Sequence, residues 1–206
     1  MNILWSFRRC PYAMRARMAL FLSEINYEHR EIKLNNKPVE FISVSSSKTV
    51  PVFVTKKGKI IEESLDIMEW SLNRNDPLKL LDCDYLESNL LIKKNDTYFK
   101  YHLDRYKYAS RYEPESSRNS INIIHRNKAE KFIQICERKL SNEDNLLHMK
   151  QTIADLAIFP FIRQFSNVEP NWWKNSNYKK TMKWLDGCTE SDLFNKIMDK
   201  HSIWKP

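Results

Sequence analysis

A change of pattern near residues 74–78 limits the fold more than any other feature of the sequence. Before it, short segments with the apolar spacing of strands alternate with segments that have helical spacing. After it, every long apolar segment has helical spacing. The break holds Asn-Asp-Pro, a combination typical of turns and linkers. We therefore expect two domains, residues 1–74 and an all-helical domain of residues 85–206, joined by a linker at 75–84.

The first part is expected to fold as an α/β domain. Its expected strands are residues 2–7, 27–32, 50–54 and 60–61, and its expected helices are residues 11–23, 38–44 and a segment from Glu62 or Glu63 to Asn73. The order βαβ, α, ββ, α predicts a thioredoxin-like domain, in which helices cover a mixed sheet.

The second part predicts five helices, at residues 85–108, 120–140, 153–165, 177–185 and 191–200. The segment 153–165 is apolar on nearly all sides, which is typical of a buried central helix. Thr152 precedes this segment and Asp155 follows three residues later, the pattern of a capping box. Pro160 is expected to kink this helix or to shorten its hydrogen bonding.

Cys10 lies where the first strand is expected to turn into the first helix. Pro11 favours a helix start, because the first helical N–H has no partner in any case. The apolar residues Met14, Met18, Phe21, Leu22 and Ile25 have the spacing of one helix face, which we expect to be buried. A thiolate at a helix N-terminus faces unpaired N–H groups and the positive end of the helix dipole, which lowers thiol pKa values. Arg8, Arg9 and Arg15 favour the thiolate as well. The alternative is a small structural cysteine, and we favour the reactive thiol.

Composition excludes several classes of protein. The 206 residues carry a net charge of +8 that is spread along the chain, and this indicates an acidic small molecule or general solubility as readily as nucleic acid. We expect no transmembrane helix and no signal peptide, and we expect a cytoplasmic protein. The other cysteines, Cys83, Cys136 and Cys188, are scattered without metal-ligand spacing, so thiols and no metal site are expected.

Four segments of the first domain together resemble the cytosolic glutathione transferases. Cys10-Pro11-Tyr12-Ala13 resembles the active-site turn of the cysteine-type classes, such as the omega class and similar bacterial proteins. The other three segments are Asn36-Lys37-Pro38, Thr49-Val50-Pro51-Val52 and Glu62-Glu63-Ser64, and Thr152–Ala157 resembles a capping element of the helical domain.

The resemblance implies a glutathione site. It implies that Lys37 approaches the glycine carboxylate, that Val50 pairs with the peptide backbone next to a cis Pro51, and that Glu63 and Ser64 hold the γ-glutamyl end. Each role is physically reasonable. A helix start with a serine hydroxyl suits a carboxylate, a carboxylate suits an ammonium group, and a free backbone edge suits a peptide. Each residue also has an ordinary structural explanation, such as capping a helix or facing water.

A cysteine at this position implies thiol exchange. A mixed disulfide of Cys10 with glutathione is expected, and conjugation of electrophiles is expected to be weak. Because Ala13 replaces a second cysteine, a second glutathione has to release Cys10. The resemblance also implies a small electrophilic or disulfide substrate and a homodimer. Aromatic candidates for the electrophile site, none expected to be catalytic, are Tyr12, Tyr101, Tyr106, Trp172 and Trp173.

Two alternatives remain open. Residues 45–48, Ser-Ser-Ser-Lys, depart from the family pattern beside the expected peptide site, so glutathione binding is expected to be weakened if their geometry differs. Separately, one alternative is a non-catalytic binding or regulatory protein on the same fold, and the presence of Cys10, Glu63 and Ser64 together argues against it. Residues 98–112 interleave basic and aromatic residues, which can stack on bases, but we favour a packed helix and consider a nucleic-acid partner unlikely.

Overall fold

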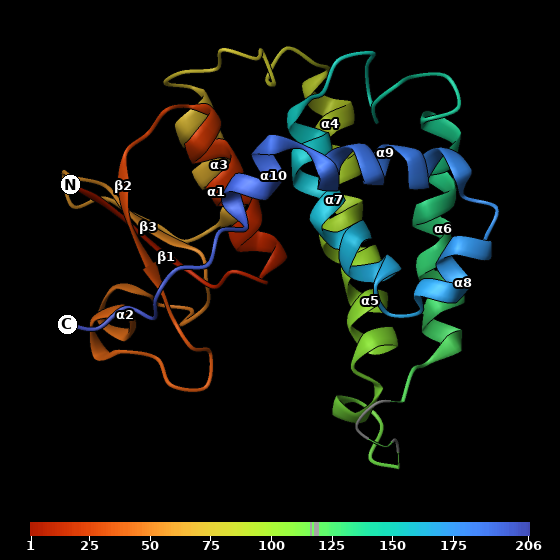
Figure 1. Ribbon diagram of the computed structural model, residues 1–206, viewed down its shortest axis with the longest axis horizontal. Coiled ribbons are helices and arrows are strands. Elements are labelled where there is room, and N and C mark those ends of the chain that lie inside the picture. The colour runs from red at the N-terminus through yellow and green to blue at the C-terminus, as the bar shows by residue number, and fades with distance from the viewer. Residues whose placement is uncertain (116, 118–119) are drawn as a thin grey trace. The chain divides into compact units, whose positions relative to one another are not determined.

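Four strands form a mixed sheet in the first part of the chain (Figure 1): β1 (Asn2–Ser6), β2 (Tyr27–Glu31), β3 (Val52–Val54) and β4 (Ile60–Ile61). Their order is β2-β1-β3-β4, with β2 parallel to β1, and β3 antiparallel to both β1 and β4. A helix connects the parallel strands β1 and β2, and a turn around Gly58, at φ 84°, joins the antiparallel strands β3 and β4. The thioredoxin-like domain expected from the sequence is confirmed. The structure describes residues 1–115, 117 and 120–206.

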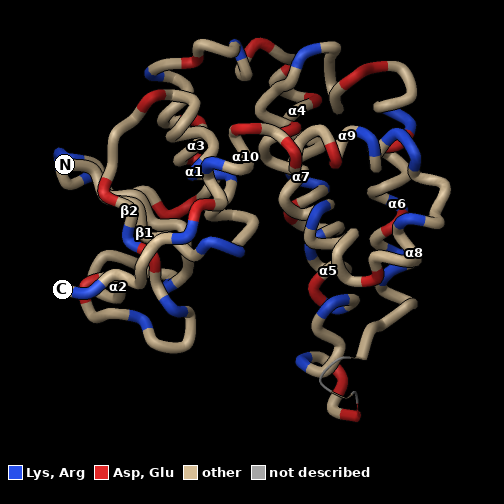
Figure 2. The backbone as a smooth tube through the Cα atoms, in the orientation of Figure 1, with Lys and Arg blue, Asp and Glu red and all other residues tan. Residues whose placement is uncertain are grey.

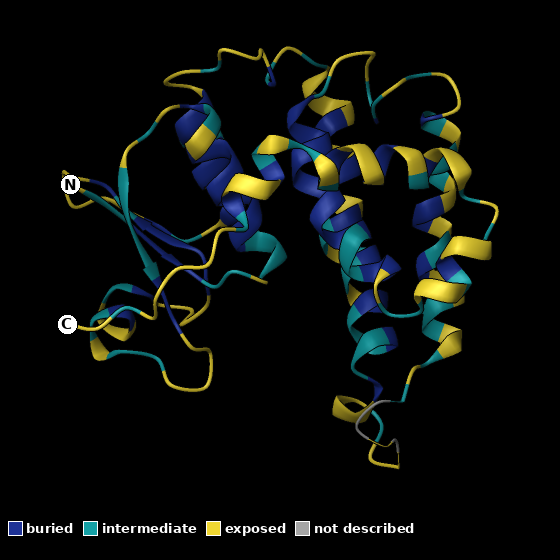
Figure 3. Cartoon of the chain, viewed as in Figure 1, coloured by how far each residue is buried: buried dark blue, intermediate teal, exposed yellow. Residues whose placement is uncertain are grey.

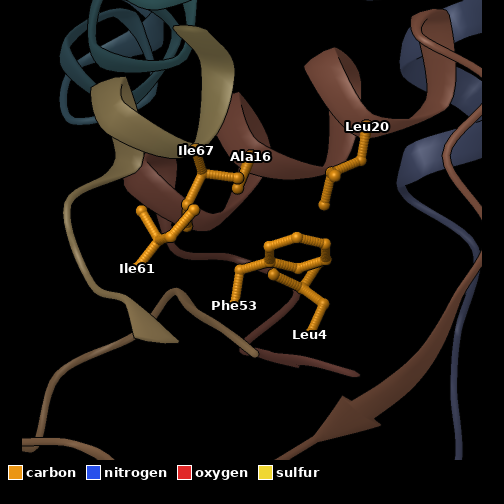
Figure 4. Close-up of a cluster of buried hydrophobic side chains, with 6 residues drawn as sticks. All are labelled: Leu4, Ala16, Leu20, Phe53, Ile61 and Ile67. Carbon is orange, nitrogen blue, oxygen red and sulfur yellow. The ribbon is translucent and has the colours of Figure 1, made fainter. Parts of the chain in front are cut away.

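Both faces of the sheet are covered by apolar side chains. The helices α1 (Pro11–Leu22) and α3 (Ser64–Leu72) supply the cluster on one face, which Figure 4 shows with Leu4 and Phe53 of the sheet beneath Ala16, Leu20 and Ile67. The second cluster joins Trp5 and Val52 of the sheet to Phe41 of α2 (Val39–Val44). Burial of large apolar side chains, at roughly 1.5–3 kcal/mol each, therefore holds both layers on the sheet.

Helix α1 is buried more completely than its sequence suggested. The eight residues from Ala13 to Leu20 are all buried, and Figure 3 shows the middle of this helix dark blue. Phe21, expected on the buried face, is 46% exposed. The interpretation of α1 as a helix with one buried face was therefore wrong, because the sheet, α3 and the C-terminal helix α10 (Asp192–Ile197) all pack against it.

The C-terminal segment, residues 190–206, joins the first unit. By contacts, the chain divides into Met1–Leu80 with Glu190–Pro206, and Leu81–Thr189. The Trp204 N–H donates to the Glu31 carbonyl at 2.9 Å, so the segment extends the edge of the sheet beside β2. The domains expected at 1–74 and 85–206 stay a prediction, since contact-based units do not show which parts fold independently.

The second unit is helical. Its helices are α4 (Tyr85–Lys94), a π-helical turn (Asn95–Phe99), α5 (Lys100–Lys107), a 3-10 turn (Ala109–Arg111), α6 (Ile123–Lys139), α7 (Ile153–Ser166), α8 (Pro170–Asn175) and α9 (Lys179–Glu190). The single helix expected at 85–108 therefore contains a π-helical turn, and the short α8 was not expected. No helix in the described part of the chain is long and apolar enough to cross a membrane.

Helix α7 is the buried centre of this unit, as expected. Twelve of its fourteen residues are buried. The capping box is present: the Thr152 N–H and hydroxyl both bond one oxygen of Asp155, at 2.8 and 2.9 Å. The other Asp155 oxygen accepts from the Leu146 N–H at 2.8 Å and from the Trp184 indole at 3.0 Å. One carboxylate thus caps α7 and ties two other segments to it.

Candidate active site

Cys10 precedes the first residue of α1, at the position that the sequence indicated. Its backbone is extended, with φ −74° and ψ 122°, and Pro11 begins the helix. The Cys10 N–H donates to the Phe7 carbonyl and its carbonyl accepts from the Met14 N–H, each at 3.0 Å. These bonds fix the backbone of Cys10, and its side chain is half-buried. The thiol is therefore held at a helix N-terminus without being sealed from reagents.

The Cys10 side chain lies against the loop that enters β3. Its Sγ is 3.6 Å from the Val50 carbonyl oxygen, to which the thiol donates. Val50 and Pro51 are buried, and the peptide bond between them is cis. The carbonyl that the sequence predicts to face a bound peptide backbone is thus the one next to the thiol.

The start of α3 provides Glu63 and Ser64. Glu63 is the exposed residue before the helix, and Ser64 begins it and is only 3% exposed. Arg15 of α1, which is fully buried, donates to the Ser64 hydroxyl at 3.4 Å and places its guanidinium 5.4 Å from the centre of the Tyr12 ring. Arg15 therefore links the helix that begins at Cys10 to the expected γ-glutamyl site.

The serine-rich loop, residues 45–49, is tied down at two points. The Lys37 ammonium donates to the Lys48 carbonyl at 2.8 Å. Glu62 accepts hydrogen bonds from the Ser45 hydroxyl at 3.0 Å, from the Ser46 hydroxyl and from the Ser47 N–H at 3.3 Å. These bonds, the Ser46 hydroxyl first, lower the pKa of Glu62 below its ordinary value. The loop that departs from the family pattern thus has its own anchoring carboxylate.

Sequence analysis missed Glu62 as the loop anchor and the buried Arg17, and it named Arg15 only for its charge near Cys10, without its burial or its hydrogen bond to Ser64. The two arginines had a detectable pattern. They interrupt the otherwise apolar run Ala13–Leu20, and a buried arginine needs acceptors nearby. Glu62 had no such pattern in the sequence, because its hydrogen-bond partners depend on how the serine-rich loop folds.

The aromatic candidates from the second unit lie mostly in its core. Tyr106 is fully buried and its hydroxyl donates to Glu169 at 2.7 Å, while burial raises its pKa. Trp173 is 8% exposed and stacks on Tyr178, and Trp172 packs at an angle to Trp173. Tyr101 is about half exposed, under Arg105. These contacts are packing contacts.

The interleaved basic and aromatic residues bind one another. The Arg105 guanidinium lies 3.5 Å from the centre of the Tyr101 ring and 4.3 Å from that of Tyr112, and Arg111 lies 4.1 Å from that of Tyr108. Figure 2 shows Lys and Arg interspersed with Asp and Glu along the chain. The ring faces that would stack on bases are thus partly occupied by the chain's own cations.

Comparison with known proteins places this geometry in context. Residues 4–79 match the family described as glutathione S-transferase, N-terminal domain. A probable glutathione S-transferase, parA of Nicotiana tabacum, is 23% identical over 206 residues, covering 98% of this chain and 91% of the relative. Glutathione S-transferase omega-1 of Sus scrofa is 33% identical over 84 residues, covering 41% of this chain and 35% of the relative.

Solved structures agree on the fold. The glutathione transferase URE2P6 of Phanerochaete chrysosporium, solved in complex with oxidized glutathione, aligns with a TM-score of 0.81 at 17% identity, over 95% of this chain and 94% of that one. A glutathione S-transferase of Rhodospirillum rubrum aligns with a TM-score of 0.78 over 100% of this chain and 96% of that one. The first part of the chain thus matches the N-terminal domain of the glutathione S-transferases, and the whole chain has the fold of the solved glutathione transferases.

Proposed function

We propose that this protein is a glutathione-dependent thioltransferase that works through a mixed disulfide at Cys10. The observation that carries the proposal is the half-buried thiol at the N-terminus of α1, beside the Val50 carbonyl. A serine or tyrosine hydroxyl there would only stabilise the glutathione thiolate, whereas a cysteine sulfur forms a disulfide with it.

The reaction needs two exchanges. The Cys10 thiolate attacks the glutathione sulfur of a mixed disulfide, and the other sulfur leaves as a thiolate that takes up a proton. Cys10 is then bonded to glutathione. The thiolate of a second glutathione attacks that glutathione sulfur, so oxidised glutathione is released and the Cys10 thiolate returns. Ala13 stands where a second cysteine would resolve the intermediate, so the second glutathione is required.

Residues around Cys10 suit the parts of glutathione. The backbone of Val50, beside the cis Pro51, suits the cysteinyl backbone. Ser64 and the first N–H groups of α3 suit the γ-glutamyl carboxylate, and the exposed Glu63 suits its ammonium. Lys37 suits the glycine carboxylate, because the Lys48 carbonyl to which its ammonium donates is neutral and leaves the lysine charge unneutralised.

We propose the cysteine-type, omega-like subclass for the same reason. The partial similarity to omega-1 proteins, including 36% identity over 67 residues with that of Rattus norvegicus, is consistent with this assignment. The similarity that spans the whole chain is to the tobacco proteins. Weak conjugation of electrophiles and strong disulfide exchange would support the omega-like assignment, and the reverse activities would contradict it.

The decisive experiment is the intact mass of the protein after incubation with oxidised glutathione. We expect one glutathione adduct on the wild type and none on Cys10→Ser. Cys83→Ser is the matched control: Cys83 is also half-buried, but burial raises the pKa of its thiol, so this variant should keep the adduct. A folded wild type without an adduct would overturn the proposal and favour a non-catalytic binding protein.

We also propose that the protein forms a homodimer. Helix α4 exposes Tyr85, Leu86 and Leu90 to between 69% and 72%, the two leucines one turn apart. Three apolar side chains this exposed on one short helix are typical of an interface.

A further inference from the structure

Arg17 lies on α1, two helical turns after Cys10, and its side chain is buried, with 2% of the residue exposed. A guanidinium has five N–H donors, and those of Arg17 are all used. Its Nε donates to the Ile197 carbonyl at 2.9 Å. One terminal nitrogen donates to the Ser6 hydroxyl at 2.6 Å and the Phe7 carbonyl at 3.4 Å. The other donates to the Arg8 carbonyl at 2.7 Å and lies 3.9 Å from the Met198 sulfur.

These acceptors come from two places. Ser6, Phe7 and Arg8 are the end of β1 and the turn that leads directly into Cys10, whose own N–H is bonded to the Phe7 carbonyl. Ile197 and Met198 belong to the C-terminal segment, about 180 residues later in the chain. One planar side chain therefore holds the turn that carries Cys10 against the C-terminal segment.

Every one of these acceptors is neutral, so the hydrogen bonds satisfy the guanidinium without cancelling its charge. The acidic residue in its electrostatic surroundings is Glu31, 5% exposed, which is hydrogen-bonded by the Arg8 N–H at 2.6 Å and by His29 at 3.0 Å. Burial lowers the pKa of Arg17, while Glu31, Tyr27 and Cys10 act against that effect and Arg8 adds to it. An arginine stays charged even so. The Cys10 sulfur thus lies within the field of a buried cation.

We propose that Arg17 is the positioning residue of Cys10, and that it both holds the turn before Cys10 and supplies a buried positive charge that favours the thiolate. The C-terminal segment is part of this device because it provides two of the five acceptors. The role of Arg17 in thiol transfer rests on the proposed function. Its effect on the Cys10 thiolate does not, since any small alkylating reagent reports on that thiolate.

The other charged and titratable groups around Arg17 come from each element that packs there. They are Tyr27, His29 and Glu31 on β2, Arg8 in the turn, and His201 in the C-terminal segment, which stacks on His29 with ring centres 3.8 Å apart. Burial lowers the pKa of His201, so a test has to separate the titration of this histidine from that of Cys10.

The first test is the pH profile of Cys10 alkylation by iodoacetamide, followed by peptide mass spectrometry. In Arg17→Gln, we expect the midpoint to move about 1 pH unit upward, the low end of what a nearby opposite charge produces. Arg17→Lys keeps the charge and should restore most of that shift. Arg163→Gln is the control, since Arg163 is a half-buried arginine of the other unit whose pKa burial also lowers. A profile of folded Arg17→Gln that coincides with the wild type would overturn the proposal.

A second test needs no change at Arg17. The ¹⁵N NMR signal of the Arg17 Nε–H in the wild type should shift with pH at the midpoint of Cys10 alkylation, because an interaction between two groups is felt by both. Cys10→Ser should remove this step and leave any step caused by another group. A signal that titrates identically in the wild type and in Cys10→Ser would overturn the proposal even if no Arg17 variant folds. Either result is independent of whether glutathione is the substrate.

Discussion

Ser64 is buried and hydrogen-bonded to a cationic side chain. Its hydroxyl accepts from Arg15 at 3.4 Å, and this pair lies at the start of α3, where the γ-glutamyl carboxylate is proposed to bind. Ser64→Ala removes a hydroxyl from that carboxylate and also removes the hydroxyl to which Arg15 donates. A hydrogen bond to a charged group contributes about 1.5–3 kcal/mol, so we expect KM for glutathione to rise at least about tenfold.

The matched control is Ser71→Ala. Ser71 is also buried on α3, but its hydroxyl bonds the Met68 carbonyl within the helix. This variant should leave KM for glutathione unchanged. An unchanged KM in Ser64→Ala, measured by initial rates at varied glutathione, would mean that the γ-glutamyl end binds elsewhere.

At the scale of the element, a pair of histidines joins α5 to α6. The Nδ1 atoms of His102 and His125 are 2.7 Å apart, so one ring donates a proton to the other and both rings cannot be protonated at Nδ1. Burial, the His125 ring and the cations Lys128, Arg105 and Lys131 lower the pKa of His102 to about 4, and burial and cations lower the pKa of His125 as well.

This pair predicts that stability falls in acid. In the unfolded chain His102 takes up a proton near pH 6.5, whereas in the folded chain it does so near pH 4. Between these values the unfolded state binds more protons, so stability is full above about pH 7 and is lost as the pH falls toward 4. For His102 alone these pKa values give about 2 kcal/mol between pH 7.5 and 5. Because solvent screens the partly buried pair, we expect about half of that loss, or a fall in Tm of about 2–4 °C.

Thermal unfolding followed by circular dichroism at the two pH values tests this. His102→Gln should lose that part of the pH dependence, whereas His148→Gln, which changes an exposed histidine outside the helix pair, should retain it. The same pH dependence in His102→Gln and in the wild type would show that other groups control acid stability.

Element types were predictable because they depend on local spacing, and the capping box at Thr152 and Asp155 is a local motif. What the sequence could not reveal depends on contacts between distant segments. Nothing near Arg17 indicates that Ile197 and Met198 provide its acceptors. The π-helical turn at Asn95–Phe99 follows a segment whose apolar spacing suggested one continuous helix. The serine loop could be recognised as unusual, but its bond to Glu62 could not.

At the scale of the molecule, the proposed homodimer makes the exposed face of α4 a testable surface. Leu86 is 72% and Leu90 69% exposed, and they lie one turn apart on this helix beside Tyr85. Because a charge buried without a partner in an interface costs several kcal/mol, Leu86→Glu should shift a dimer toward monomers of 24.8 kDa.

Sedimentation velocity over a range of concentrations measures this shift. Met149→Glu is the control, since Met149 is 57% exposed outside the helices, and it should sediment as the wild type does. A monomeric wild type would contradict the homodimer itself, whereas a dimeric Leu86→Glu would place the interface on another surface.

The intact mass of monomeric Leu86→Glu after incubation with oxidised glutathione then shows whether adduct formation needs the dimer. One unit of one chain contains all the residues proposed to react with or bind glutathione: Cys10, Lys37, Val50, Pro51, Glu63 and Ser64. We therefore expect the monomer to form the adduct, and loss of the adduct would show that the partner chain completes the site.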